Sequence, residues 1–371
     1  MSMEISRQSQ SAGDNSQQIQ AQAVYITNGI SEQRVREICS EVATRAIADN
    51  SFEATNVAMQ RIERFVDLLL PRMQQIEKDF ASFADPAFQV LLRKAQLTAA
   101  CSDRENDYGL LSELLAHRIK NKTDIKKKAS ITKAAEIIDQ IDDDSLCGMT
   151  LLHAMQSFTP LSGSVEEGLT ALDTLYQKLN LSALPTDALW IDNLSVLGAA
   201  TSIHFSKMTD YEERLYNTLD GYCCVGINKE HLNYTTAMDM LSQSGFSTSV
   251  LIDNELLEGY VRLCIPRKSS VNDLQGTITE NINGVIQVKS IPVDESQKEC
   301  VRNVFKLYSE DPALKDQVKK AFNKKIHTFP TLSRATTWWN SLQQNVVLTS
   351  VGKAIAHTNA KRIDHTLPDL D

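Results

Sequence analysis

Residues 61–83 read RIERFVDLLLPRMQQIEKDFASF, and their apolar residues recur every three or four positions. The stripe comprises Ile62, Phe65, Leu69, Met73, Ile76, Phe80 and Phe83. This spacing places the apolar side chains on one face of a helix, so it predicts an amphipathic helix that packs into a helical core. Pro71 lies inside the stripe. We expect a kink or a break near Leu70, because proline removes a backbone donor.

The helical period continues on both sides of this stretch. Residues 35–47 carry a second stripe, and Asp85-Pro86 combines an N-cap with a proline suited to the first helical position. Further helices are expected around residues 110–119, 131–141 and 146–158. Later helix starts are predicted where a hydroxyl precedes a carboxylate by three residues, at Ser164 with Glu167, Thr209 with Glu212, and Ser296 with Glu299.

The last third of the chain combines helical periodicity with the two-residue periodicity of strands. Strand-like runs at residues 250–252, 260–265, 277–279, 285–291 and 346–348 alternate with helical patterns. We therefore predict a mainly α fold with four parts: a flexible or β segment (1–30), a multi-helical domain (31–232), a smaller mixed α/β module (233–362) and a tail (363–371). The order of helix, strand and loop in the module resembles winged-helix connectivity, which serves DNA binding in most cases and protein joining in many others.

Composition limits the class of protein. The 371 residues correspond to roughly 2.5 domains of average size. Hydrophobic residues make up 42% and charged residues 23%, as in folded domains, and the net charge is −9. That charge argues against a chain that coats nucleic acid or membrane globally. The sequence shows neither a signal-peptide pattern nor a run of about 18 apolar residues, so we predict a cytoplasmic protein without membrane contact.

One segment near the N-terminus has a different period. No charged residue occurs from Asn15 to Ser31, and side chains alternate as in a strand. A lone strand needs a partner for its backbone groups. It can pair with copies of itself through glutamine ladders, dock on its own chain, or remain a disordered tail. For self-association the contact residues are Gln18, Ile19, Gln20, Ala21, Gln22, Ala23, Val24, Tyr25 and Ile26.

A basic stripe is the candidate nucleic-acid contact. Its lysines recur at helical spacing, and an arginine follows them: Lys315, Lys319, Lys320, Lys324, Lys325 and Arg334. Such a stripe can lie along phosphates, with an affinity that falls as salt rises. The adjacent Trp338-Trp339 could stack on bases, although a buried tryptophan pair is the commoner use.

No local motif for catalysis or cofactor binding is found. The chain contains no GxxxxGK[ST], GxSxG, HExxH or GxGxxG motif. Its seven histidines are scattered without metal-ligand spacing, and its seven cysteines form no CxxC pair and are expected to be mostly buried free thiols. Asp142-Asp143-Asp144 could attract a divalent cation, but helix N-capping explains it better. We predict no enzyme activity, no cofactor and no metal site.

Two segments carry a resemblance. Residues 11–16, SAGDNS, lead into Ile19-Gln20-Ala21, and residues 348–357 read LTSVGKAIAH. Together they resemble the opening and closing segments of an uncharacterised bacterial protein family. The resemblance implies a bacterial cytosolic protein with a role in defence against phage, and it supplies no catalytic residue. We therefore expect a non-enzymatic, homo-oligomeric interaction or scaffold protein with an unidentified protein partner. The alternative is a nucleic-acid-binding regulator that uses the C-terminal module.

Overall fold

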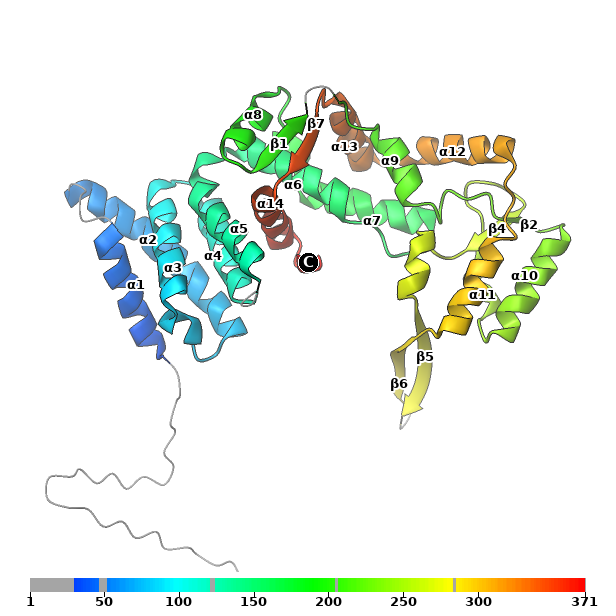
Figure 1. Ribbon diagram of the computed structural model, residues 1–371, viewed down its shortest axis with the longest axis horizontal. Helices are drawn as coiled ribbons and strands as arrows, with labels where there is room; N and C mark the ends of the chain where they lie inside the picture. The colour runs from blue at the N-terminus through cyan, green and yellow to red at the C-terminus, as the bar shows by residue number, and fades with distance from the viewer. Residues whose placement is uncertain (1–29, 47–51, 121–123, 204–205, 283–284, 371) are drawn as a thin grey trace, which may run out of the picture.

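The N-terminal half of the chain builds a helical body along one limb of an arch (Figure 1). The computed structural model describes residues 30–46, 52–120, 124–203, 206–282 and 285–370. The helices of this limb are α1 (Glu32–Ala46), α2 (Phe52–Ile76), α3 (Pro86–Cys101), α4 (Glu105–Lys120), α5 (Ile125–Ile137) and α6 (Asp143–Ser157), with 3-10 turns η1 (Ala81–Ala84) and η2 (Ile138–Gln140). The predicted mainly α fold is confirmed.

The stripe in residues 61–83 is buried as predicted. Phe65, Leu69, Met73 and Phe83 are completely inaccessible to solvent, and Ile76 is partly buried. The expected break near Leu70 is wrong, because α2 continues through Pro71 to Ile76. The chain leaves the helical conformation only afterwards, and Phe80 and Phe83 enter the same core from the loop and from η1.

The top of the arch is built from segments that are far apart in sequence (Figure 1). It contains α7 (Val165–Lys178), η3 (Leu181–Ala183), α8 (Leu189–Val196), β1 (Ala200–Ile203) and α9 (Tyr211–Thr218), followed much later by α12 (Pro312–Ile326), α13 (Pro330–Ser341) and β7 (Asn345–Leu348). Strands β1 and β7 pair antiparallel, with Thr201 opposite Val347. The same hydrophobic core continues from the N-terminal helices through these elements.

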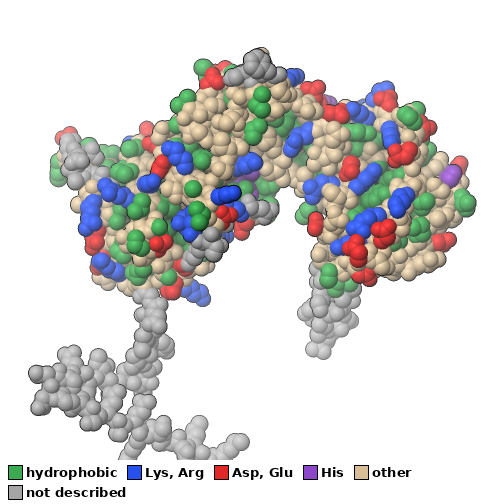
Figure 2. Space-filling view, in the orientation of Figure 1, with side chains coloured by type: hydrophobic (Ala, Val, Ile, Leu, Met, Phe, Trp, Pro, Cys, Tyr) green, Lys and Arg blue, Asp and Glu red, His purple; other side chains and the backbone are tan. Residues whose placement is uncertain are grey.

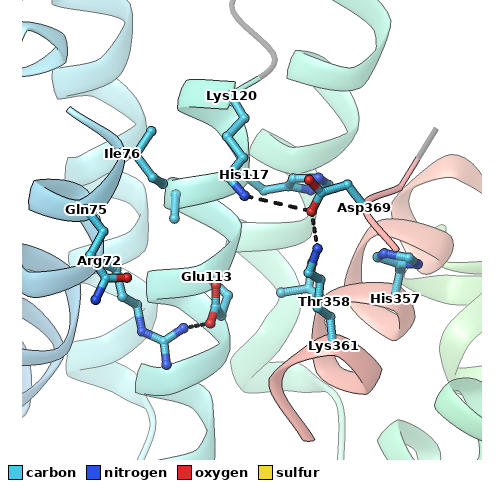
Figure 3. A pocket seen from close by; sticks show the side chains of 11 residues that line it. Arg72, Gln75, Ile76, Glu113, His117, Lys120, His357, Thr358, Lys361 and Asp369 are labelled. Atoms are coloured by element: carbon cyan, nitrogen blue, oxygen red, sulfur yellow. Dashed lines mark hydrogen bonds and ion pairs between the residues drawn. The ribbon is translucent and has the colours of Figure 1, made fainter. Parts of the chain in front are cut away.

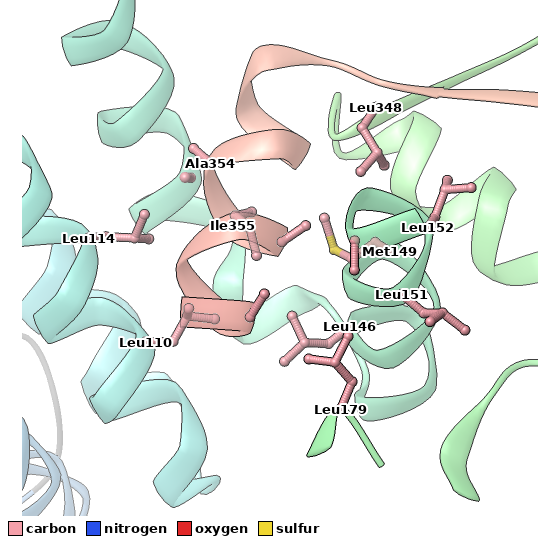
Figure 4. Packing of buried hydrophobic residues seen from close by; sticks show 14 of the residues in the cluster. Leu110, Leu114, Leu146, Met149, Leu151, Leu152, Leu179, Leu348, Ala354 and Ile355 are labelled. Carbon is pink, nitrogen blue, oxygen red and sulfur yellow. The ribbon is translucent and has the colours of Figure 1, made fainter. Parts of the chain in front are cut away.

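The last helix, α14 (Ser350–Ile363), lies inside the N-terminal limb and packs against α4, α5 and α6 (Figure 4). Its residues Ala354, Ile355, Ala356 and Ala360 are almost fully buried. Small side chains dominate this surface, so the neighbouring helices can approach closely. The helix thus packs the end of the chain against three earlier helices, of which α4 begins 245 residues before it, at Glu105.

Gly352 fixes where α14 begins. Thr349 is the N-cap, and its hydroxyl accepts a hydrogen bond from the Gly352 amide at 3.3 Å. A Cβ added at Gly352 would lie 2.0 Å from the carbonyl oxygen of Ala199. Because that neighbour is backbone rather than a flexible side chain, only glycine fits without moving β1 away from the helix.

We predict that Gly352→Ala destabilises the protein by more than about 2 kcal/mol, since the new methyl group overpacks a rigid contact. Gly109→Ala in α4 is the matched control, because its Cβ would meet only the flexible Arg362 side chain, at 3.4 Å. Helix propensity should make this control neutral or stabilising. Denaturant titration of both variants measures the difference, and equal effects would contradict the assignment.

The other limb is a separate mixed α/β module (Figure 1). It comprises β2 (Ile227–Asn228), α10 (Leu232–Gln243), η4 (Thr248–Val250), β3 (Leu251–Asp253), β4 (Tyr260–Leu263), η5 (Lys268–Asp273), β5 (Gln275–Ile282), β6 (Val285–Pro292) and α11 (Glu295–Phe305). Its three-stranded sheet has the order β2-β4-β3, and β5 and β6 form a separate hairpin. A second hydrophobic core, with members from Cys224 to Tyr308, belongs to it.

This second core begins and ends earlier in the chain than the module predicted at residues 233–362. Residues from α12 onwards pack into the first core instead, so the module is inserted between two parts of the helical body. Helix α10 is followed by strands β3 and β4, which pair antiparallel, so the order of helix and strand that resembles a winged helix is present. However, only the three-residue turn η4 separates Ser247 from β3. Residues 227–263 are all described, and within them α10 is the one α-helix before strands β3 and β4.

A carboxylate of the module caps a helix of the body. Glu255 accepts hydrogen bonds from the backbone amides of Val165 and Glu166, at 2.7 and 3.2 Å, and from the Ser164 hydroxyl at 2.8 Å. These are unpaired groups at the positive N-terminus of α7, where a carboxylate is stabilising. Arg262, which is fully buried, lies 3.9 Å from the same carboxylate.

Tyr222 strengthens this junction. Its hydroxyl donates to the Ser162 carbonyl oxygen, and its ring lies 5.3 Å from the Arg262 guanidinium carbon. A Cβ at Gly168 would lie 2.1 Å from the Tyr222 hydroxyl oxygen, so the missing side chain makes room for the contact. The two limbs are thus held together by backbone capping and by a buried cation.

We predict that Glu255→Ala lowers the opening free energy of the first turn of α7 by about 2 kcal/mol, from the lost cap and the Arg262 charge left without its partner. Hydrogen exchange of the Val165 and Glu166 amides measures this. Glu258→Ala, an exposed carboxylate of the same loop, is the control. Unchanged protection in the Glu255 variant would show that the cap does not hold the junction.

The local start signals were only partly correct. Ser164 caps α7 as predicted, and Asp142 caps α6, which confirms the capping interpretation of the aspartate run. Thr209 is not a cap, because Asp210 precedes α9 directly. Ser296 lies inside α11, where Asp294 and Gln297 form the capping box instead of Ser296 and Glu299. At α11 an aspartate serves the cap as well as a hydroxyl does. At α9 the Asp210 side chain makes no capping hydrogen bond, and the Tyr211 amide donates to Oδ1 of Asn340 at 2.8 Å instead.

Candidate functional site

Three histidines from distant parts of the chain meet inside the helical limb. His117 lies on α4, His153 on α6 and His357 on α14. Nε2 of His153 is 3.1 Å from Nδ1 of His357, and the rings of His117 and His357 are stacked with centroids 6.5 Å apart. Their packing follows from α14, which inserts between α4 and α6.

The hydrogen bonds of this cluster define a direction. The Pro368 carbonyl oxygen can only accept, so the His357 Nε2 at 3.0 Å donates to it. A neutral His357 then accepts at Nδ1 from His153, which in turn accepts at Nδ1 from the Ser157 hydroxyl at 3.2 Å. The tautomers inferred from these partners give an ordered chain from α6 to the C-terminal segment.

Burial keeps His117 and His153 neutral. Desolvation, then repulsion from His357, lowers the pKa of both His117 and His153 to about 4. His153 is almost completely buried. At neutral pH these groups therefore act as hydrogen-bonding imidazoles and not as cations. Over the part of the chain that the structure describes, no group of three or more histidine, cysteine or acidic residues is placed to hold a metal ion.

A cavity of about 140 Å³ opens beside His117 and His357 (Figure 3). It is lined by side chains of α2, α4 and α14 and by Asp369 of the C-terminal segment. Arg72 and Glu113 form an ion pair on one wall. On the other side Asp369 pairs with Lys361 and lies 3.8 Å from Lys120, and these contacts lower the pKa of the Asp369 carboxyl.

The predicted basic stripe lies mainly on α12, and carboxylates accompany most of it. The ion pairs are Lys315 with Glu310, Lys319 with Glu213, Lys320 with Asp316 and Lys325 with Glu166. Lys324 lies in the last turn of the same helix. Arg334, on α13, donates to the Leu181 carbonyl oxygen at 2.7 Å. Because carboxylates neutralise most of these lysines, less positive charge is left to bind phosphates than the sequence indicated. Trp338 and Trp339 are buried and are not available for stacking on bases.

Some of the exposed apolar side chains lie on neighbouring elements at the top of the arch. On α8, Leu189 and Val196 are 71% and 85% exposed, and they share one face because they are seven residues apart. On the outer face of the β1–β7 ribbon, Ile203 and Val347 are 49% and 44% exposed. We call these four residues the crown. Elsewhere on the face shown in Figure 2, charges of both signs are interspersed.

The other predictions from the sequence have different outcomes. The predicted contact residues 18–26 lie outside the described residues. All seven cysteines are free; four of them are buried, whereas Cys101 and Cys264 are exposed. The histidine cluster leaves no local signal in the sequence, because His153 and His357 are 204 residues apart. Only the four-residue spacing of His153 and Ser157 was visible as a local signal.

The fold and these features define a mainly α protein with an inserted α/β module, a buried histidine cluster and a basic cavity. Among the described helices, none is both long and apolar enough to cross a membrane. A family model whose description reads only "-like" matches residues 29–370. The chain belongs to this uncharacterised family. No curated protein and no solved structure shows significant similarity to the chain.

We predict that His153 makes stability depend on pH. Its pKa is about 4 in the folded protein against 6.5 for the ordinary group, so the unfolded state binds more protons within this window and stability falls as pH drops from 6.5 to 4. The loss from this one group approaches about 3 kcal/mol.

Urea titrations across this window test the prediction in the wild type and in His153→Gln, which should show a shallower pH dependence. His365→Gln, at an exposed position, should retain the wild-type slope. A wild-type slope in the His153 variant would assign the acid sensitivity to other groups.

Proposed function

We propose that this chain is a non-enzymatic interaction protein of the bacterial cytosol that assembles with copies of itself. The crown is the observation that carries the proposal. Contiguous apolar surface on a soluble domain commonly marks a docking site, whereas single exposed apolar residues need no explanation. The crown residues lie on α8 and β1, which are consecutive and in contact, and on β7, which pairs with β1.

A second copy of this chain is the proposed occupant of the crown. An apolar surface is complementary to itself about a two-fold axis, whereas a surface of one charge is not. Exposed charges of both signs lie on or next to the crown elements: Asp192 on α8, and Lys207 after β1, which pairs with Asp210 at 3.5 Å. No excess of one charge therefore opposes the approach of a second copy.

The segment 18–26 supplies the second proposed contact. It lies outside the matched family range, which begins at residue 29. An uncharged segment with strand period and glutamines at alternate positions favours pairing with identical segments of other copies. Two different self-contacts on one chain would build assemblies larger than a dimer and give weak partner contacts the benefit of avidity.

The cellular role in this proposal comes from the resemblance of the two terminal segments. On this resemblance we propose a role in defence against phage, in which a protein partner would bind the helical surfaces. The braced arch supports such a role, because Glu255 and Tyr222 fix the two limbs relative to each other. A surface held in one geometry loses less entropy when it binds a partner.

Light scattering of the full chain tests the proposal. We expect an oligomer whose mass falls in a version starting at Ser31, which lacks the predicted strand, and falls separately in the full-length double variant Val196→Ser, Ile203→Ser. The matched control is Leu161→Ser, which removes a side chain that is 90% exposed and lies away from the crown.

The outcomes distinguish the two contacts. A monomeric full chain at all concentrations would overturn the assembly proposal. An oligomer that survives the crown variant but not the truncation would remove the crown and retain the strand. Nucleic acid added to the same samples tests the alternative function: salt-dependent binding that is lost in Lys319→Ala, Lys324→Ala would favour the regulator instead.

A further inference from the structure

The C-terminal segment closes the cavity beside the histidines by polar contacts. After α14, Asp364 pairs with Lys178 at 2.7 Å, which lowers the pKa of this carboxyl to about 2 and anchors the start of the segment. Further on, Pro368 accepts from His357 at 3.0 Å and the Leu370 carbonyl oxygen accepts from Lys127 at 3.4 Å. We call residues 364–370 the strap.

The charges beneath the strap are not balanced. The cavity wall contains Arg72, Lys120 and Lys361 as cations and Glu113 and Asp369 as carboxylates. Arg72 is already paired with Glu113, so two ammonium groups share the single charge of Asp369. A further cation lies nearby, because Arg362 contributes to the lowered pKa of Arg72. The site therefore favours an anion with more charge than one carboxylate.

The Asp369 side chain can be displaced from the two lysines. This side chain is 56% exposed, pairs with Lys361, lies 3.8 Å from Lys120 and also interacts electrostatically with His117. Exposed ion pairs of this kind contribute at most about 1 kcal/mol. The firmly held part of the strap is its start at Asp364, about five residues away. Displacement of Asp369 therefore does not require α14 to move.

We propose that this cavity binds the phosphate group of a small phosphorylated ligand, and that Asp369 occupies its two lysines in the ligand-free protein. A phosphate dianion would match Lys120 and Lys361, which lie one on α4 and one on α14. The space beside them, about 140 Å³, exceeds the roughly 30 Å³ share of one water several times. Thr358 and Gln75 provide polar groups on the wall, and Ile76 provides an apolar one (Figure 3).

The site is independent of the proposed assembly. It lies on α2, α4 and α14, away from the crown elements α8, β1 and β7. Ligand binding would be communicated to the histidine chain, because the strap that carries Asp369 also carries the Pro368 carbonyl that accepts from His357. Loss of that acceptor would leave the His357 Nε2 donor to bond the ligand or water.

Calorimetric titration with inorganic phosphate tests the proposal, with sulfate and acetate at matched ionic strength as further probes. We expect Asp369→Asn to bind phosphate about ten-fold more tightly than the wild type, because the competing carboxylate no longer occupies the site. Asp369→Asn combined with Lys361→Ala should lose that gain. Glu258→Ala should bind as the wild type does.

Hydrogen exchange of the strap in the wild-type chain provides a second measurement that needs no variant. Phosphate should increase exchange of the Leu367 amide, which donates to the Asp364 carbonyl oxygen at 3.2 Å, and of the Asp369 and Leu370 amides, whereas acetate should have less effect because it carries one charge. Equal affinity of the wild type and Asp369→Asn, or strap exchange that phosphate leaves unchanged, would overturn the proposal. Binding that survives Lys361→Ala would place the anion elsewhere.

Discussion

The burial of α14 is the constraint on which the rest of the structure depends. This helix lies between α4, α5 and α6, and its small residues allow those helices to approach it. Because it is the last helix described, the first limb is complete only when the end of the chain has returned. The contact is non-local, and closing so long a loop costs entropy that the buried surface must offset. Gly352 against the Ala199 carbonyl determines how deeply the helix enters.

This return path explains why the α/β module is inserted and not appended. Residues between α9 and α12 form a second core, and the chain then crosses back along α12 and α13 to the first. The module is attached by the Glu255 cap on α7 and by Tyr222, and Arg262 is buried close to both. A buried cation near a capping carboxylate penalises any arrangement that separates them, so the junction has one preferred geometry.

The same helix creates the polar interior of the limb. His357 enters beside His153 and His117, and the strap that follows α14 supplies the acceptor and the carboxylate that close the cavity. Helix α14 therefore contributes both to the hydrophobic core and to the wall of the basic cavity. A change in the strap reaches the histidines through the Pro368 acceptor of His357 and through the charge of Asp369 on His117. The crown and the charge-paired α12 are built from other surfaces.

The sequence by itself determined the helical class, the buried stripe of residues 61–83, the position of most helices, and the strands between residues 250 and 291. These features depend on local periodicity and on caps, which neighbouring residues specify. It also indicated that Asp142 is a cap. It could not show that α2 continues through Pro71, because surrounding packing decides whether a helix tolerates proline.

Only the tertiary structure decided where the module ends, which lysines are neutralised and which histidines meet. The pairs Lys319 with Glu213 and His153 with His357 join residues that lie 106 and 204 positions apart, so no window of sequence contains both partners. Strand partners were equally hidden, since β7 pairs with β1 and not with the strands near it in sequence. Local pattern specifies which face of an element is buried, and the global path of the chain specifies what covers it.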